Sequence, residues 1–189
     1  MKTFLVALLF FFSAAAFAQN QTLIAAAEAA CGPMDVQFEV HPSKEQPLTQ
    51  PDPGKSLVYV IEEFDRAINE WVSPTLRMGL DGKWVGAVKG DSYLALSVDP
   101  GEHHLCTNWQ SSVKRLSSKV AFTSLNAEPG KIYYFRARII EGGQSFTIDF
   151  IPVDEDEGKY LVASAAPSDS HAKGSGKKAP PDQSSTKGN

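Results

Sequence analysis

The sequence is poor in cysteine, in excess basic charge and in long apolar runs. Its 189 residues include two cysteines, too few for a disulfide-dense scaffold or a cysteine-rich zinc site. Lys and Arg total 18 against 22 Asp and Glu, which gives a net charge of −4, so we expect no nucleic-acid partner. No segment supplies the roughly 20 apolar residues that a membrane-spanning helix needs. We therefore do not expect an integral membrane protein.

The sequence also lacks the short motifs that mark common enzymes and cofactor sites. It contains no G-x-S-x-G elbow, no H-E-x-x-H zinc helix and no glycine-rich loop of the phosphate-binding or dinucleotide-binding type. The acidic run Asp154–Glu157 lacks the alternating spacing of a calcium-binding loop. These absences remove every specific reason to expect an enzyme, so we predict a non-catalytic protein without a cofactor.

The N-terminus has the three parts of a secretory signal peptide. Lys2 precedes the apolar run Phe4–Phe12, and small residues follow as far as Ala16-Phe17-Ala18. We expect cleavage between Ala18 and Gln19, so that residues 1–18 are removed and the mature chain is periplasmic or extracellular. An uncleaved membrane anchor is the alternative, but the apolar run is short for a span.

The mature chain keeps both cysteines, Cys31 and Cys106. An even number of cysteines outside the cytoplasm favours a disulfide, so we expect these two to be bonded. Two buried thiols and a catalytic thiol are the alternatives. His104 shares a strand face with Cys106, but residues two apart on a strand lie about 6.6 Å apart, which is long for a thiol and its base.

Most of the mature chain shows the two-residue alternation of β-strands. Residues 19–55 hold a short helix-forming stretch, one strand over Asp35–His41 and a proline-rich loop. Residues 56–162 hold the remaining strands, which recur every eight to twelve residues or so between Pro and Gly turns. Asp81-Gly82 is the clearest hairpin turn, because both residues of such a turn need positive φ.

We therefore predict an all-β fold, an antiparallel β-sandwich of about seven to nine strands. Residues 31–55 belong to the same single domain as the core, residues 56–162. Short helical segments are expected near the N-terminus and after the last strand, and residues 65–73 are expected to form a helical turn or a loop. Residues 163–189 contain no large apolar side chain and are predicted to be a disordered tail.

Two stretches resemble known modules of the bacterial envelope. Leu80–Gly86 and Asp99–Leu105 together carry a D-G-K-x-V-G … P-G-x-H-x-L pattern, which resembles PEGA-like β-sandwich modules. Glu128–Arg136 is similar to the A-G-K-x-Y-Y-x-R strand of a secreted bacterial family described only as a domain of unknown function. The resemblance covers roughly residues 55–152. It implies a small envelope β-sandwich and brings no reaction and no catalytic residues.

Aromatic and arginine side chains are the candidates for a binding surface. Trp84, Trp109 and Tyr134 would stack on sugars or peptides where exposed, although large aromatics more often fill a core. Arg136 and Arg138 share a strand face with Tyr134, where they either bind a carboxylate or phosphate or line the wet side of a sheet.

His103 and His104 are the candidate metal ligands. Adjacent residues of a strand point to opposite faces, so the two do not readily share one ion, and a tetrahedral site needs further ligands from elsewhere. A packed histidine beside an exposed one is the alternative that this geometry favours, so we expect no metal.

Together these patterns predict a secreted or periplasmic, non-catalytic β-sandwich module that binds or scaffolds a component of the cell envelope. The partner is expected to be an envelope protein, a glycan or a peptide. A lysine-bearing tail that contacts anionic lipid or cell wall is a second possibility. An envelope hydrolase with an unrecognised site is the alternative, and only long-range folding would bring its groups together.

Overall fold

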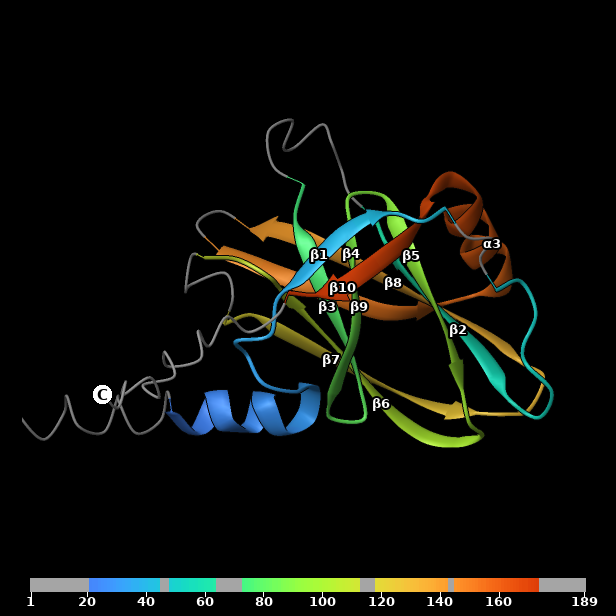
Figure 1. Ribbon diagram of the computed structural model, residues 1–189, viewed down its shortest axis with the longest axis horizontal. Helices are drawn as coiled ribbons and strands as arrows, with labels where there is room; N and C mark the ends of the chain where they lie inside the picture. Colours follow the sequence, from blue (N-terminus) through green and yellow to red (C-terminus); the bar gives the residue numbers. More distant parts are fainter. Residues whose placement is uncertain (1–20, 45–47, 64–72, 113–117, 143–144, 174–189) are drawn as a thin grey trace, which may run out of the picture.

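The computed structural model describes residues 21–44, 48–63, 73–112, 118–142 and 145–173 (Figure 1). The predicted signal peptide with its expected cleavage site and most of the segment 65–73 lie outside these residues. The described part contains a helix over residues 21–31, one further helix and ten strands. Their bounds are β1 Phe38–Pro42, β2 Ser56–Glu62, β3 Thr75–Leu80, β4 Lys83–Lys89, β5 Ser92–Val98, β6 Gly101–Trp109, β7 Val120–Ala127, β8 Ile132–Gly142, β9 Ser145–Val153, α3 Glu155–Ser164 and β10 Ala166–Ala172.

The strands form two sheets, which confirms the β-sandwich architecture. The six-stranded sheet has the order β1-β10-β5-β2-β8-β9, and the four-stranded sheet has the order β4-β3-β6-β7. Ten strands exceed the expected seven to nine. The expectation of a purely antiparallel sandwich is wrong as well, because β2 pairs with β8 and β10 pairs with β5 in parallel. Strand β2 is buried along its whole length, as expected for a strand that is central in its sheet and covered on both faces.

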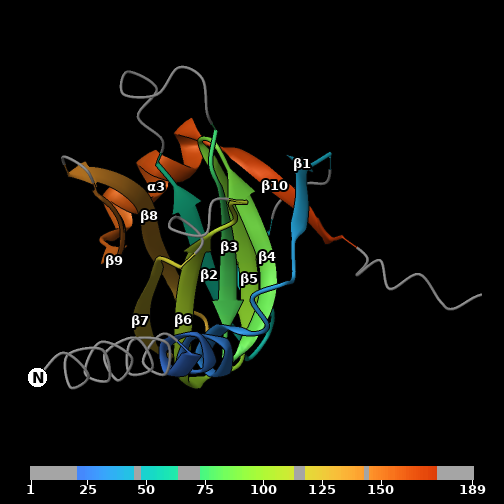
Figure 2. The ribbon, with the colours of Figure 1, turned by 90° about the vertical axis from the view of Figure 1, so that its left-hand side faces the viewer.

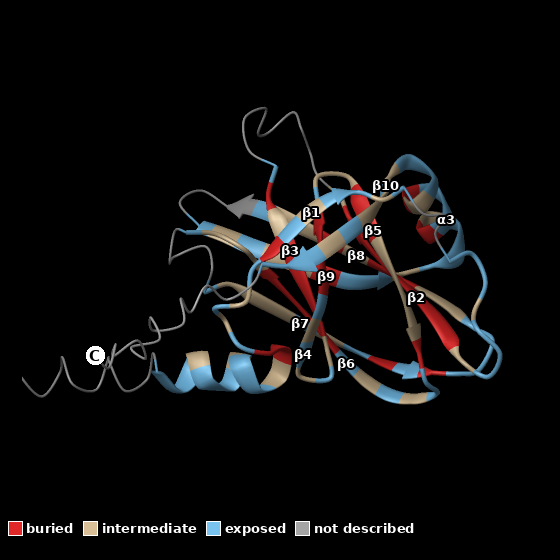
Figure 3. Ribbon diagram, viewed as in Figure 1, coloured by how far each residue is buried: buried red, intermediate tan, exposed pale blue. Residues whose placement is uncertain are grey.

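Two apolar clusters hold the layers together. The larger one lies between the sheets and includes Val58, Val60, Leu76, Leu105 and Phe135. The smaller one lies between the six-stranded sheet and α3, on the opposite face of β2. Buried segments accordingly run through the middle of the strands, whereas most of the helix over 21–31 is exposed (Figure 3). Among the described residues, none of the helices has both the length and the apolar character to cross a membrane.

The Asp81-Gly82 hairpin forms as predicted, between β3 and β4. Asp81 has φ 49° and Gly82 has φ 77°, the left-handed values that a two-residue hairpin turn of this kind requires. The turn thus places the Asp81 side chain at the end of the four-stranded sheet, where it becomes part of the site described below.

The segment predicted to be a disordered tail is ordered in its first part. Residues 166–172 form β10, which pairs antiparallel with β1 and parallel with β5. Its polar side chains contribute to this order: Ser168 contacts the Ser92 hydroxyl at 2.8 Å, and the Ser170 hydroxyl accepts the Ala87 backbone N–H at 3.0 Å. Hydrogen bonds to neighbouring strands therefore replace the apolar burial that the segment lacks. Residues 174–189 lie outside the described part.

The helix expected after the predicted strands is α3, which covers one face of the six-stranded sheet. Asp154 caps it, because its Oδ1 accepts the Glu157 backbone N–H at 2.8 Å. Gly158 lets the helix approach the sheet closely, since a Cβ at this position would lie 2.2 Å from Cγ of Tyr134. Viewed from a second direction, α3 and the helix over 21–31 lie at opposite ends of the sandwich (Figure 2).

Candidate functional site

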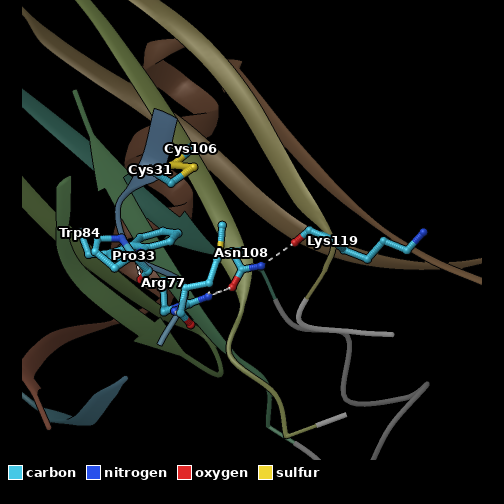
Figure 4. Close-up of a disulfide and its surroundings, with 8 residues drawn as sticks. Cys31, Pro33, Arg77, Trp84, Cys106, Asn108 and Lys119 are labelled. Carbon is cyan, nitrogen blue, oxygen red and sulfur yellow. Dashed lines mark hydrogen bonds between the residues drawn. A yellow bond between two sulfur atoms is a disulfide. The ribbon is translucent and has the colours of Figure 1, made fainter. Parts of the chain in front are cut away.

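The N-terminal segment crosses the outer face of the four-stranded sheet, where a disulfide anchors it. Cys31, at the end of the helix over 21–31, is bonded to Cys106 of β6, and their Cα atoms lie 5.9 Å apart (Figure 4). This confirms the predicted disulfide. Gly79 of β3 leaves the necessary room, because a Cβ there would lie 2.5 Å from Sγ of Cys106. Both cysteines are buried, so the bridge is closed to solvent.

A buried arginine holds the next residues of this segment. Nη1 of Arg77 donates to the carbonyl oxygens of Met34 at 3.0 Å and Val36 at 2.6 Å, and Nε donates to Oδ1 of Asn108 at 3.0 Å. Its guanidinium also lies 4.4 Å from the centre of the Trp84 ring (Figure 4). Burial lowers the pKa of Arg77 to about 10, so the group stays charged at neutral pH. Disulfide and guanidinium therefore fix the segment on the sheet.

The end of this N-terminal helix and the adjacent strands enclose a cleft of about 410 Å³, which we call the outer cleft. Its volume falls within the range of small-molecule sites. The outer cleft is lined by pairs of residues from four elements: Ala29 and Ala30 of the helix, Asp81 and Gly82 of the β3–β4 turn, His104 and Leu105 of β6, and Phe122 and Thr123 of β7.

Phe122 is the most conspicuous part of the outer cleft. Its side chain is 56% exposed, although it is a large aromatic in the middle of β7. The rest of the lining includes the two alanines of the helix end together with polar residues, among them Asp81 and His104. An apolar surface with a few polar groups is the usual character of a ligand site, so the outer cleft is the candidate binding site of the described chain.

His103, one residue before His104, belongs to the structure behind the cleft. Nδ1 of His103 lies 2.7 Å from Oδ2 of Asp81, and Nε2 lies 2.7 Å from the carbonyl oxygen of Asp99. Oδ1 of Asp81 accepts the backbone N–H of His104 at 2.9 Å. Burial alone would raise the pKa of Asp81, but these bonds from His104 and His103 outweigh it and lower that pKa below 3.8.

The two histidines are not arranged as metal ligands. The His104 ring is exposed on the other strand face, where its nearest charged partner is Glu102 at 3.9 Å. No cluster of three or more His, Cys, Asp or Glu side chains suited to a metal ion occurs in the part of the chain that is described. Neither nitrogen of His103 is free to act as a base, because both are hydrogen-bonded to protein oxygens.

The structure does not bring the expected tryptophans together. Trp84 lies on the outer face of the four-stranded sheet and donates its indole N–H to the Pro33 carbonyl at 2.8 Å. Trp109 packs against the core between the sheets, with its ring edge-on to Phe146 at 5.8 Å. Tyr134 lies in a third place, buried beneath α3. These side chains therefore form no common stacking platform.

Arg136 and Arg138 lie together, as expected, on the face of the six-stranded sheet that carries α3. Arg136 pairs with Glu157 of α3 and lies 3.6 Å from Glu63. Arg138 lies 3.8 Å from Glu63 and 3.4 Å from Asp149. Both arginines thus pair with carboxylates of the chain itself, and the network joins Glu63, which directly follows β2, to β8, β9 and α3.

Sequence reasoning missed Phe122 and both helix residues of the outer cleft. One signal was available for Phe122. It lies on the same face of β7 as the polar Ser124 and Asn126, whereas its neighbours Ala121 and Thr123 point to the other face. An aromatic on the polar face of a strand indicates a contact surface. Ala29 and Ala30 carried no such signal, since long-range contacts, the disulfide among them, bring the helix end to this sheet.

Comparisons with protein-family models, with curated proteins and with solved structures found no match to this chain. The resemblance to PEGA-like modules therefore stays a prediction, and the site rests on its own geometry.

Proposed function

We propose that the mature chain is a secreted or periplasmic, non-catalytic β-sandwich module that binds a component of the cell envelope in the outer cleft. The component is an envelope protein, a peptide or a glycan. Two observations support the proposed compartment: the N-terminal signal pattern, and the disulfide, a bond that persists in oxidising surroundings.

The exposed Phe122 ring in the lining of a cleft of about 410 Å³ is the observation that carries this proposal. A solvated aromatic contributes nothing to the core, and it offers a face on which a sugar ring or an apolar side chain can stack. The helix-end wall is held firmly, because the disulfide fixes Cys31 directly after Ala29 and Ala30. A preorganised wall lowers the entropic cost of binding.

The alternative of an envelope hydrolase has less support in this geometry. The Asp81–His103 pair resembles the orienting half of a catalytic triad, but the nitrogen of His103 that would face a nucleophile is bonded to the Asp99 carbonyl. A base occupied in this way does not accept a proton from a serine or a water molecule.

Capture from the cell envelope tests the binding proposal. Mature protein, residues 19–189, is immobilised and incubated with solubilised envelope, and the retained proteins and glycans are identified by mass spectrometry. The Phe122→Ser variant should lose the specific partner. Tyr160→Ser is the matched control, since Tyr160 of α3 is a 71% exposed aromatic at the far end of the sandwich. Equal capture by both variants would refute the outer cleft as the binding site.

A further inference from the structure

His103 connects two turns at the end of the sandwich that carries the outer cleft. One ring nitrogen lies 2.7 Å from the Asp81 carboxylate, and the other lies 2.7 Å from the Asp99 backbone oxygen. Asp81 belongs to the β3–β4 turn, and Asp99 lies in the turn between β5 and β6. The His103 side chain is only 13% exposed, so water does not readily replace either contact.

The chemistry of the partners requires the ring to carry two protons. A backbone carbonyl oxygen and an ionised carboxylate only accept hydrogen bonds, and both His103 nitrogens face such acceptors. A neutral imidazole has one N–H, so it would keep one bond and turn a lone pair toward the other oxygen. Only the imidazolium therefore donates to both oxygens at once.

The charges around His103 favour this cation. Asp81 faces the ring from the β3–β4 turn, and Asp99 faces it from the β5–β6 turn, where the Asp99 carboxylate also lies 3.3 Å from Lys55. Glu102, beside His103 on β6, contacts the other histidine, and Leu125 is the residue opposite on β7. Partial burial favours the neutral ring, but the hydrogen bonds to Asp81 and Asp99 outweigh it and raise the pKa of His103 above 6.5.

We propose that His103 is a proton-operated latch for the outer cleft, which holds the Asp81-Gly82 wall in place while the imidazole is charged and frees it when the proton is lost. The Asp81 carboxylate is the side of the latch that moves, because it is 45% exposed and finds water when it leaves the ring. Movement of the Asp81-Gly82 turn also affects the helix end, because the two are in close contact. A Cβ built at Gly82 would lie 3.0 Å from the Ala29 carbonyl oxygen.

The latch has a defined pH window. Stability that depends on a histidine with a raised pKa is complete below its unfolded value and is lost as the pH rises through the folded value. Stability that depends on Asp81, whose pKa is lowered, is lost as the pH falls through that lowered value. The wall is therefore fixed at mildly acid pH and loosens on the alkaline side. The relevance of this motion to binding rests on the proposed function, whereas the latch itself is a property of the free protein.

Nuclear magnetic resonance of the ligand-free mature protein tests the latch. Imidazole ¹⁵N shifts report the protonation of each histidine, and amide exchange of Asp81 reports the wall, because its N–H donates to the His104 carbonyl at 2.9 Å. We expect His103 to be doubly protonated at pH 6. We also expect protection of the Asp81 amide, corrected for intrinsic exchange, to fall roughly tenfold as His103 titrates, as expected for the loss of one charge-assisted hydrogen bond.

Two variants make the test specific. His103→Gln should show the low protection at every pH, whereas His104→Gln, which alters the exposed neighbour, should keep the pH dependence of the parent. A neutral His103 ring at pH 6, or protection that does not follow its titration, would overturn the latch, and the parent protein alone decides this if His103→Gln does not fold. Because the experiment uses no ligand, failure of the envelope capture leaves this result unaffected.

Discussion

Replacing Glu62 should stabilise the protein at neutral pH, and the gain should disappear in acid. Glu62 ends β2 on the face between the sheets and is only 2% exposed. Neither of its carboxyl oxygens has a hydrogen-bond partner of normal geometry in the described structure, although the Gly90 backbone lies close enough to favour the anion. Burial raises the pKa of Glu62 from 4.5 to about 8, because the Gly90 backbone and Lys89 offset it only in part and Asp91 reinforces it.

The magnitude follows from linkage. The folded chain holds a proton on Glu62 that the unfolded chain releases above pH 4.5, so the free energy of unfolding falls as the pH rises toward 8. Each pKa unit corresponds to about 1.4 kcal/mol, so Glu62 costs about 3 kcal/mol at pH 7 and about 5 kcal/mol above pH 8. Glu62→Gln keeps the shape without the charge and should be more stable than the parent by those amounts.

Urea unfolding at pH 4.5, 7 and 8.5 measures the difference. The two proteins should agree within about 1 kcal/mol at pH 4.5, because both side chains are then neutral and both lack hydrogen-bond partners. Glu39→Gln is the control, since that carboxyl is 60% exposed and should show no comparable trend. A Glu62→Gln variant that is less stable than the parent at pH 7, or a gap that does not change with pH, would contradict the assignment of Glu62 as a buried acid.

Three further predictions concern the packing of the two helical ends. Replacing Cys31 and Cys106 together by Ala should lower the free energy of unfolding by about 4.5 kcal/mol, the chain-entropy value for a separation of 75 residues, and equal urea midpoints with and without the bridge would contradict this. Arg77→Met should lower the free energy of unfolding by about 3 kcal/mol, because two backbone carbonyls and an amide lose their buried donor. Urea unfolding that shows no loss of stability would mean that water replaces the guanidinium. Gly158→Ala should lower Tm in a thermal scan, since the clash of its Cβ with Tyr134 outweighs roughly 1 kcal/mol of helix propensity, and a higher Tm would show that α3 packs less closely.

Local sequence patterns were sufficient to predict several elements and the sheet face to which their side chains point. The Asp81-Gly82 hairpin depends on the φ preferences of two residues, and it forms where the sequence indicates. Alternation along β6 predicted that His103 and His104 point to opposite faces, and the structure has His103 largely buried and His104 exposed. These properties depend on neighbours within a few residues, which is the range that a sequence pattern reports.

The errors fall where stability comes from distant segments. Strand β10 has the composition of a disordered tail, and its order comes from backbone hydrogen bonds to β1 and β5. The parallel pairing of β2 with β8 joins residues more than 70 positions apart, and nothing in either strand specifies its neighbour. Which candidate aromatic would face solvent also depends on distant segments: Trp109 packs against the core, whereas Trp84 lies under the N-terminal segment on the outer face of the other sheet.

By itself, the sequence determined that this chain is built of short amphipathic strands between tight turns, with one pair of cysteines available for a bond. Only the tertiary structure decided which strands are neighbours, that a cleft opens between the helix end, a turn and two strands, and that Glu62 is buried without a partner. The physical reason is one of range. Periodicity and turn preference act between adjacent residues, whereas the pairing of strands and the solvation of a carboxyl depend on groups that folding brings together from far along the chain.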